Sequence, residues 1–179
     1  QTRVFGALAF IAIIGQIFLG GWTSSNYAAL MCTSLPICQG DWVSHLDFNN
    51  AFSLYQPGHD SYEFGVLDYG ERMTIHVSHR IGALVATSFV LMFCWQLKKQ
   101  QQAELNSQSN RLLALVFIQF SLGVSNVLFQ LPLIIAVLHN LGGALLLAAL
   151  TRTNYLLITN SVTDLLSPYK PKHIGSSHE

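Results

Sequence analysis

The chain has 179 residues, of which 51% are hydrophobic and only 10% are charged, and its net charge is zero. Soluble domains usually carry about 25% charged residues, so this composition excludes an ordinary water-soluble domain and indicates membrane lipid as the solvent. No cluster of Lys or Arg is present, which argues against nucleic acid as a partner.

Four apolar segments each come close to the roughly 20 residues that a membrane-spanning helix requires. They cover residues 4–22, 73–97, 112–129 and 133–155. Pro132 lies between the last two, where a new helix can begin because proline is tolerated in a first turn. We therefore predict an all-α membrane protein in which a bundle of four transmembrane helices forms one domain over residues 1–158.

The connectors predict how the chain is oriented in the membrane. The long connector, residues 23–72, contains six acidic residues and only one basic residue, whereas the short connector, residues 98–111, contains three basic ones. The positive-inside rule then places the short connector and both termini in the cytoplasm or matrix, and the long connector outside as a folded cap. We expect residues 159–179 to form a disordered tail. The chain starts at Gln1 without an initiator Met, and we expect it to be a piece of a longer protein.

Two histidines lie inside the predicted spans, where ionisable side chains are costly and suggest a function. His79 and His139 each lie six positions in from the outer end of their segment, roughly 9 Å deep at about 1.5 Å per residue. Two imidazoles facing each other across a bundle suit a six-coordinate haem iron. The small residues that follow them would let a flat macrocycle approach, namely Gly82, Ala83, Gly142, Gly143 and Ala144. The alternative is that each histidine bonds a neighbouring helix and binds nothing.

Two neighbours of His79 leave alternatives open. His76 lies three residues earlier on the same helix face, so it could replace His79 as a ligand or sit at the membrane surface. The guanidinium of Arg80 suits a haem propionate, but the side chain could equally reach the membrane interface or pair with Glu71.

Two of the three cysteines lie in the long connector. On the oxidising side of a membrane Cys32 and Cys38 should close as a disulfide, which could be redox-active or a structural link. A zinc site is a weaker alternative, although His45 and His59 are nearby. We interpret Cys94, near the inner end of the second span, as a small apolar residue of the core.

Three motifs resemble the second half of bacterial haem A synthases. They are the run from Gly20 to Leu30 followed by Cys32 and Cys38, the segment IHVSHR at 75–80 and the segment VLHN at 137–140. The likeness covers residues 5–151. It implies one of two similar four-helix halves, with a histidine on its second helix and another on its fourth.

The resemblance also implies an activity. Enzymes of this family are oxidoreductases that convert the methyl group of haem O to the formyl group of haem A, for cytochrome oxidase. By this resemblance His79 and His139 would be the axial ligands of a haem b, and the cysteine pair would take part in disulfide chemistry and electron delivery. A haem O synthase is an expected partner, and a bacterial inner membrane rather than a mitochondrial one is the expected location.

Two departures from the family pattern limit what the resemblance implies. The family often has Pro and Asp directly after the first cysteine, where this chain has Thr33 and Ser34. The other half is absent from this sequence, so we expect the chain to bind haem without completing the reaction alone. The alternatives are a b-type electron-transfer cytochrome and a periplasmic thiol-oxidising membrane protein linked to quinone.

Overall fold

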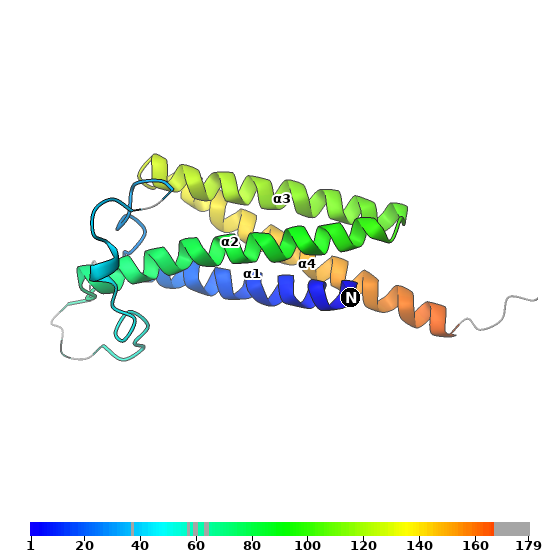
Figure 1. The fold of residues 1–179 in the computed structure, drawn as a ribbon, viewed down its shortest axis with the longest axis horizontal. Helices are drawn as coiled ribbons and strands as arrows, with labels where there is room; N and C mark the ends of the chain where they lie inside the picture. Colours follow the sequence, from blue (N-terminus) through cyan, green and yellow to red (C-terminus); the bar gives the residue numbers. More distant parts are fainter. Residues whose placement is uncertain (37, 57, 59–60, 63–64, 167–179) are drawn as a thin grey trace, which may run out of the picture.

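The computed structural model describes residues 1–36, 38–56, 58, 61–62 and 65–166, and these residues contain helices and no β-strand (Figure 1). The helices are α1 (Thr2–Ser25), η1 (Val43–His45), α2 (Tyr69–Lys99), α3 (Ala103–Leu128) and α4 (Leu133–Leu166). The four α-helices are each long and apolar enough to cross a membrane. The structure therefore confirms the predicted all-α fold with four membrane-spanning helices.

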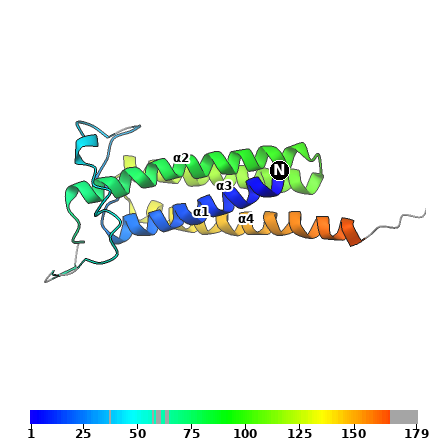
Figure 2. The same cartoon turned by 60° about the horizontal axis from the view of Figure 1, so that its bottom comes forward.

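The four long helices pack in a ring. α1 packs on α2, α2 on α3, α3 on α4, and α4 returns to α1. Within the described residues α2 does not pack on α4, so these two helices lie diagonally opposite each other. One end of the bundle, here named the loop end, carries residues 26–68 and the α3–α4 turn, and the opposite end, named the turn end, carries residues 100–102 (Figures 1 and 2).

Two helices begin at least four residues earlier than we predicted. α2 begins at Tyr69 rather than 73, because Asp68 and Glu71 form a reciprocal capping box in which Glu71 accepts a 2.7 Å hydrogen bond from the Asp68 amide. α3 begins at Ala103 rather than 112, so the short connector contains only residues 100–102. Both extensions are polar, and a search for apolar spans alone does not reveal them.

The fourth helix ends later than we predicted. It continues to Leu166, whereas the sequence analysis ended the span at residue 155 and placed a disordered tail over 159–179. Residues 159–166 are helical, and the rest of the expected tail lies outside the described residues. The chain has no Pro or Gly between residues 155 and 167, and extension of an existing helix costs little compared with nucleating one.

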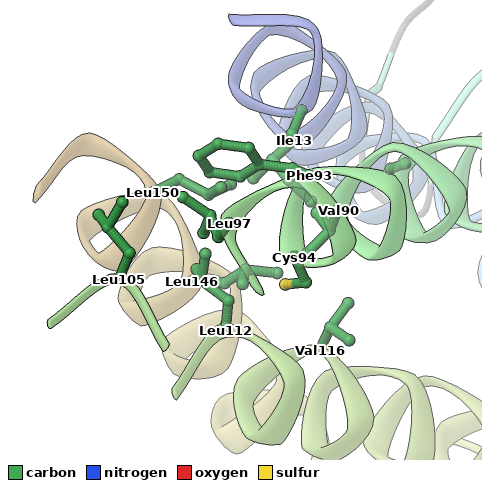
Figure 3. Packing of buried hydrophobic residues seen from close by; sticks show 12 residues of the cluster. Ile13, Val90, Phe93, Cys94, Leu97, Leu105, Leu112, Val116, Leu146 and Leu150 are labelled. Atoms are coloured by element: carbon green, nitrogen blue, oxygen red, sulfur yellow. The ribbon is translucent and has the colours of Figure 1, made fainter. Parts of the chain in front are cut away.

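The main hydrophobic core fills the turn end of the bundle (Figure 3). It contains buried residues of all four helices: Ala9, Ile13, Ala86, Val90, Phe93, Cys94, Leu97, Leu105, Leu112, Val116, Leu146 and Leu150. The core residues nearest the loop end on α2 and α4 are Ala86 and Leu146, each seven positions beyond a predicted haem ligand. Seven residues of helix rise about 10 Å, so the core forms a floor below both histidines.

The α1–α2 loop, residues 26–68, is attached to the helices by specific hydrogen bonds. The Trp22 indole donates to the Ala51 carbonyl at 2.9 Å, and the Asp47 amide donates to the Thr74 hydroxyl at 2.7 Å. Two small apolar clusters beneath the loop bury Ala51 and Cys32. The loop end is therefore covered by a packed segment.

Candidate functional site

His79 is held on α2 by two residues of α1. The Gln16 side-chain amide donates to the His79 ring Nδ1 at 3.0 Å and to the His79 carbonyl at 2.9 Å. One turn further along α1 lies Gly20, where an added Cβ would lie 3.2 Å from the imidazole Cε1. A side chain at that position would therefore crowd the ring, and the glycine leaves the imidazole its place.

His139 is held on α4 in the same way by two residues of α3. The Gln119 amide nitrogen lies 3.5 Å from the His139 Nε2, and a Cβ on Gly123 would lie 3.2 Å from the ring Cε1. Because α2 and α4 lie diagonally opposite each other, the two histidines come from facing helices.

Two of the glycines that follow the histidines contact glutamine side chains. A Cβ on Gly82 would collide with Oε1 of Gln16, and a Cβ on Gly142 would collide with Oε1 of Gln119. These glycines make room for the two glutamine side chains. Whether the small residues after the histidines also let a macrocycle approach stays a prediction.

The surroundings of the two histidines form an internal repeat. In each α-helical hairpin a glutamine is followed by a leucine and a glycine, and the histidine of the second helix is followed by a glycine three residues later. The members are Gln16, Leu19, Gly20, His79 and Gly82 in α1 and α2, and Gln119, Leu122, Gly123, His139 and Gly142 in α3 and α4. From the sequence alone we assigned no chemistry to either glutamine.

The repeat extends into the turn end of the bundle. The Ser109 hydroxyl of α3 donates to the Cys94 carbonyl of α2 at 3.1 Å, and the Asn154 amide of α4 donates to the Gly6 carbonyl of α1 at 3.2 Å. Cys94 and Asn154 each lie fifteen positions after their histidine, and Ser109 and Gly6 each lie ten before their glutamine. If α1 is exchanged with α3 and α2 with α4, the contact between Ser109 and Cys94 maps onto the contact between Gly6 and Asn154. A two-fold axis along the bundle would produce this relation.

Three buried polar atoms around the histidines have no hydrogen-bond partner among the described residues. They are Oε1 of Gln16, Oε1 of Gln119 and Nδ1 of His139. Buried polar atoms without partners are rare and call for a ligand, an ion or a water. Two imidazoles on diagonally opposite helices, with unpaired polar atoms around them and an apolar floor below, fit a planar cofactor that takes nitrogen ligands.

Two apolar hollows of about 380 and 460 Å³ lie elsewhere on the described surface. The first is lined by α1 and loop residues including Phe18 and Leu54, and the second lies between α2 and α3 beside Leu91 and Phe117. Most of these large side chains are exposed, and neither hollow includes His79 or His139. They suit lipid tails rather than a cofactor.

Arg80 links α2 to the cysteine pair of the loop. Its guanidinium donates to the Ser34 carbonyl at 2.9 Å and to the Cys32 carbonyl at 2.6 Å, and it lies 3.1 Å from the Cys32 sulfur. The predicted disulfide between Cys32 and Cys38 is present. In this structure Arg80 therefore bonds the loop, while the Glu71 carboxylate caps its own helix.

His76 also contacts the loop. The ring is only 4% exposed, and its Nδ1 donates to the Ala28 carbonyl at 2.8 Å. His45 packs edge-on against Tyr69, with ring centroids 5.6 Å apart, and His59 lies outside the described residues. Within the described part of the chain no three His, Cys, Asp or Glu side chains gather as a metal site would require. Cys94 is buried in the core, as predicted.

Comparison with known proteins identifies relatives. The COX15-CtaA family model, described as cytochrome oxidase assembly protein, matches residues 1–151. A protein named Heme A synthase from Shewanella oneidensis is 53% identical over 150 residues, which cover 84% of this chain and 45% of that protein. Those from Rickettsia bellii and Flavobacterium psychrophilum are each 27% identical, over 88% and 84% of this chain and 43% and 42% of their own lengths.

The chain spans less than half the length of these curated relatives. No solved structure matches it. The match to the family model covers most of the chain and confirms the resemblance carried by the three sequence motifs. The chain is therefore a multi-pass membrane protein that belongs to the haem A synthase family of cytochrome oxidase assembly proteins.

Proposed function

We propose that this chain binds a haem b between His79 and His139 and serves as the haem-carrying half of a haem A synthase. The observation that carries the proposal is the repeated arrangement of the two histidines on diagonal helices, each beside a glutamine and a glycine. The names of the relatives support haem as the chemical class of the cofactor.

The residues of this chain determine which chemistry the cofactor supplies. His79 and His139 would hold the haem iron, and a haem held by two imidazoles would supply electron transfer rather than oxygen binding. The apolar core below the histidines excludes water from the turn end of the site. Arg80 remains our predicted partner for a haem propionate, and its Nε has no partner among the described residues.

We further propose that the full-length protein oxidises the methyl group of haem O to the formyl group of haem A for cytochrome oxidase assembly. In that reaction this chain relays electrons, and the substrate haem lies in a part of the protein outside this sequence. A haem O synthase is the proposed partner that delivers haem O. The proposed location is a bacterial inner membrane, with both termini and residues 100–102 in the cytoplasm.

The proposal is tested by reduced-minus-oxidised absorption spectra of the detergent-purified protein and of the variants His79→Ala and His139→Ala. We expect a low-spin b-type spectrum in the unmutated protein and its loss in both variants, because each removes one axial ligand. His45→Ala changes an exposed loop histidine and should keep the full spectrum.

Circular dichroism shows whether the variants remain helical. A spectrum that survives in either helical variant would show that another side chain binds the iron, and His76→Ala would then test the alternative ligand. Absence of haem from the folded, unmutated protein would contradict the proposal and favour thiol oxidation by the cysteine pair. A b-type haem in a full-length protein that makes no haem A would favour a simple electron-transfer cytochrome.

A further inference from the structure

Gln16 and Gln119 occupy equivalent positions beside the two histidines. Each lies four residues before the glycine that contacts the imidazole, and each covers the glycine that follows the histidine. A glutamine inside a membrane bundle is costly unless its amide is satisfied. Here both amide oxygens are buried and without a partner among the described residues, so packing alone does not explain the two side chains.

The chemistry of a ligating histidine supplies the missing partner. An imidazole that binds iron through Nε2 carries its proton on Nδ1, and this N–H is normally donated to a nearby acceptor that fixes the ring and raises its basicity. The Gln16 amide already contacts Nδ1 of His79. The acceptor that the ligating ring needs is therefore the oxygen of the same amide.

We propose that Gln16 and Gln119 are positioning residues whose amide oxygens accept the Nδ1–H of His79 and His139 when these rings bind haem iron. This inference rests on the proposed haem function. Rotation of the Gln16 amide exchanges its hydrogen bond to the His79 carbonyl for one from the ring N–H. At the second site, rotation of the His139 imidazole would bring its unpaired Nδ1 to the unpaired amide oxygen of Gln119.

The glycines beneath the amides support this assignment. Gly82 and Gly142 are the positions where any side chain would displace the glutamine oxygens. The two sites therefore share three features that serve one purpose: a glycine that admits the imidazole, a glutamine that contacts it and a glycine that admits the glutamine.

The experiment measures the haem midpoint potential and the haem retained after detergent dilution in the protein at its natural length. The variants are Gln16→Leu, Gln119→Leu, Gln16→Glu and Gln119→Glu. Leucine removes the acceptor at similar volume, so we expect a higher midpoint potential and about 10- to 100-fold weaker haem binding, with the low-spin spectrum kept. Glutamate is a stronger acceptor that makes the ligand more basic and stabilises ferric iron, so its variants should have a lower potential.

Gln108→Leu is the matched control. This glutamine is buried in the same helix as Gln119 but lies eleven residues toward the turn end, roughly 16 Å away along the helix axis. Its replacement should leave the haem potential unchanged. Opposite shifts of the midpoint potential in the leucine and glutamate variants of Gln16 and Gln119 would support the inference. A packing role alone would not make the direction of that shift depend on the strength of the hydrogen-bond acceptor.

Two results would overturn the inference, and they are distinguishable. If the unmutated protein has a bis-histidine spectrum that needs His79 and His139, but all four glutamine variants keep its potential and haem content, the positioning role fails while the proposed function stands. If the unmutated protein binds no haem, the proposed function fails and this inference fails with it.

Discussion

Asp47 organises the loop by accepting three hydrogen bonds. Its carboxylate accepts from the Asn49 amide at 3.0 Å, from the Asn50 amide at 3.2 Å and from the Asn50 side chain at 2.8 Å. The side-chain bond from Asn50, followed by its backbone bond, lowers the pKa of Asp47 below the usual value of 3.8. The backbone amide of Asp47 binds Thr74 on α2, so this residue also connects the loop to the bundle.

This lowered pKa predicts a pH dependence of stability. Because the pKa is lower in the folded state, Asp47 stabilises the fold at pH values above the usual pKa, and this contribution is lost as the pH falls through the folded value. Thermal unfolding of the protein and of Asp47→Ala, measured from pH 7 to pH 3, should show a gap in unfolding temperature that narrows on acidification. Asp41→Ala, an exposed loop carboxylate, is the control. A gap for Asp47→Ala that is constant over this range would contradict the prediction.

Among single residues, the sequence pattern singled out the two histidines inside the spans but not the glutamines that contact them. His79 and His139 stand out because a histidine in an apolar run needs an explanation. Gln16 and Gln119 do not, since a lone polar amide in a span usually marks helix packing. The repeat that reveals them has no fixed period, because glutamine and histidine are separated by 63 residues in the first hairpin and 20 in the second.

Two adjacent glycines of α1 test how closely the helices fit. A Cβ at Gly20 would press on the His79 ring, whereas a Cβ at Gly21 has nothing within 4 Å. We expect Gly20→Ala to displace the imidazole and weaken haem binding, and Gly21→Ala to keep full haem content. Haem content per protein after purification, with circular dichroism as the check on folding, measures both. Equal haem content in the two variants would show that the fit at Gly20 does not matter.

At the scale of helices, sequence patterns predicted existence but not length. Hydropathy marks the part of a helix that faces lipid, and the polar ends of α2, α3 and α4 continue in the same conformation beyond it. The predicted depth of His79 depended on a helix end that hydropathy did not locate. We counted from residue 73, whereas α2 begins four residues earlier, at Tyr69. The two histidines nevertheless have equal spacing to the core, seven residues above Ala86 and above Leu146. This equal spacing to the core is a feature of the packing that no hydropathy window reports.

For the whole molecule, the orientation in the membrane can be tested by labelling. We expect Tyr55→Cys, in the α1–α2 loop, to react with a membrane-impermeant thiol reagent added outside intact spheroplasts, because both the loop and this side chain are exposed. Gln102→Cys, in the turn between α2 and α3, should react only after the membrane is opened. The native thiol Cys94 is buried and the other two cysteines form the disulfide, so the background should be low. The reverse pattern would invert the proposed topology.

The internal repeat runs along the helices and is broken at the loop end. One hairpin carries the α1–α2 loop, with its disulfide held by Arg80, whereas the other is closed by the short turn between α3 and α4. A half-turn about the bundle axis would exchange the two faces of a flat, unsymmetrical macrocycle. The repeated histidines and glutamines alone would therefore bind both orientations of the macrocycle equally well. The loop is the part that distinguishes them. If a porphyrin binds at His79 as proposed, the residues that break the symmetry would determine which of its two faces meets that ring.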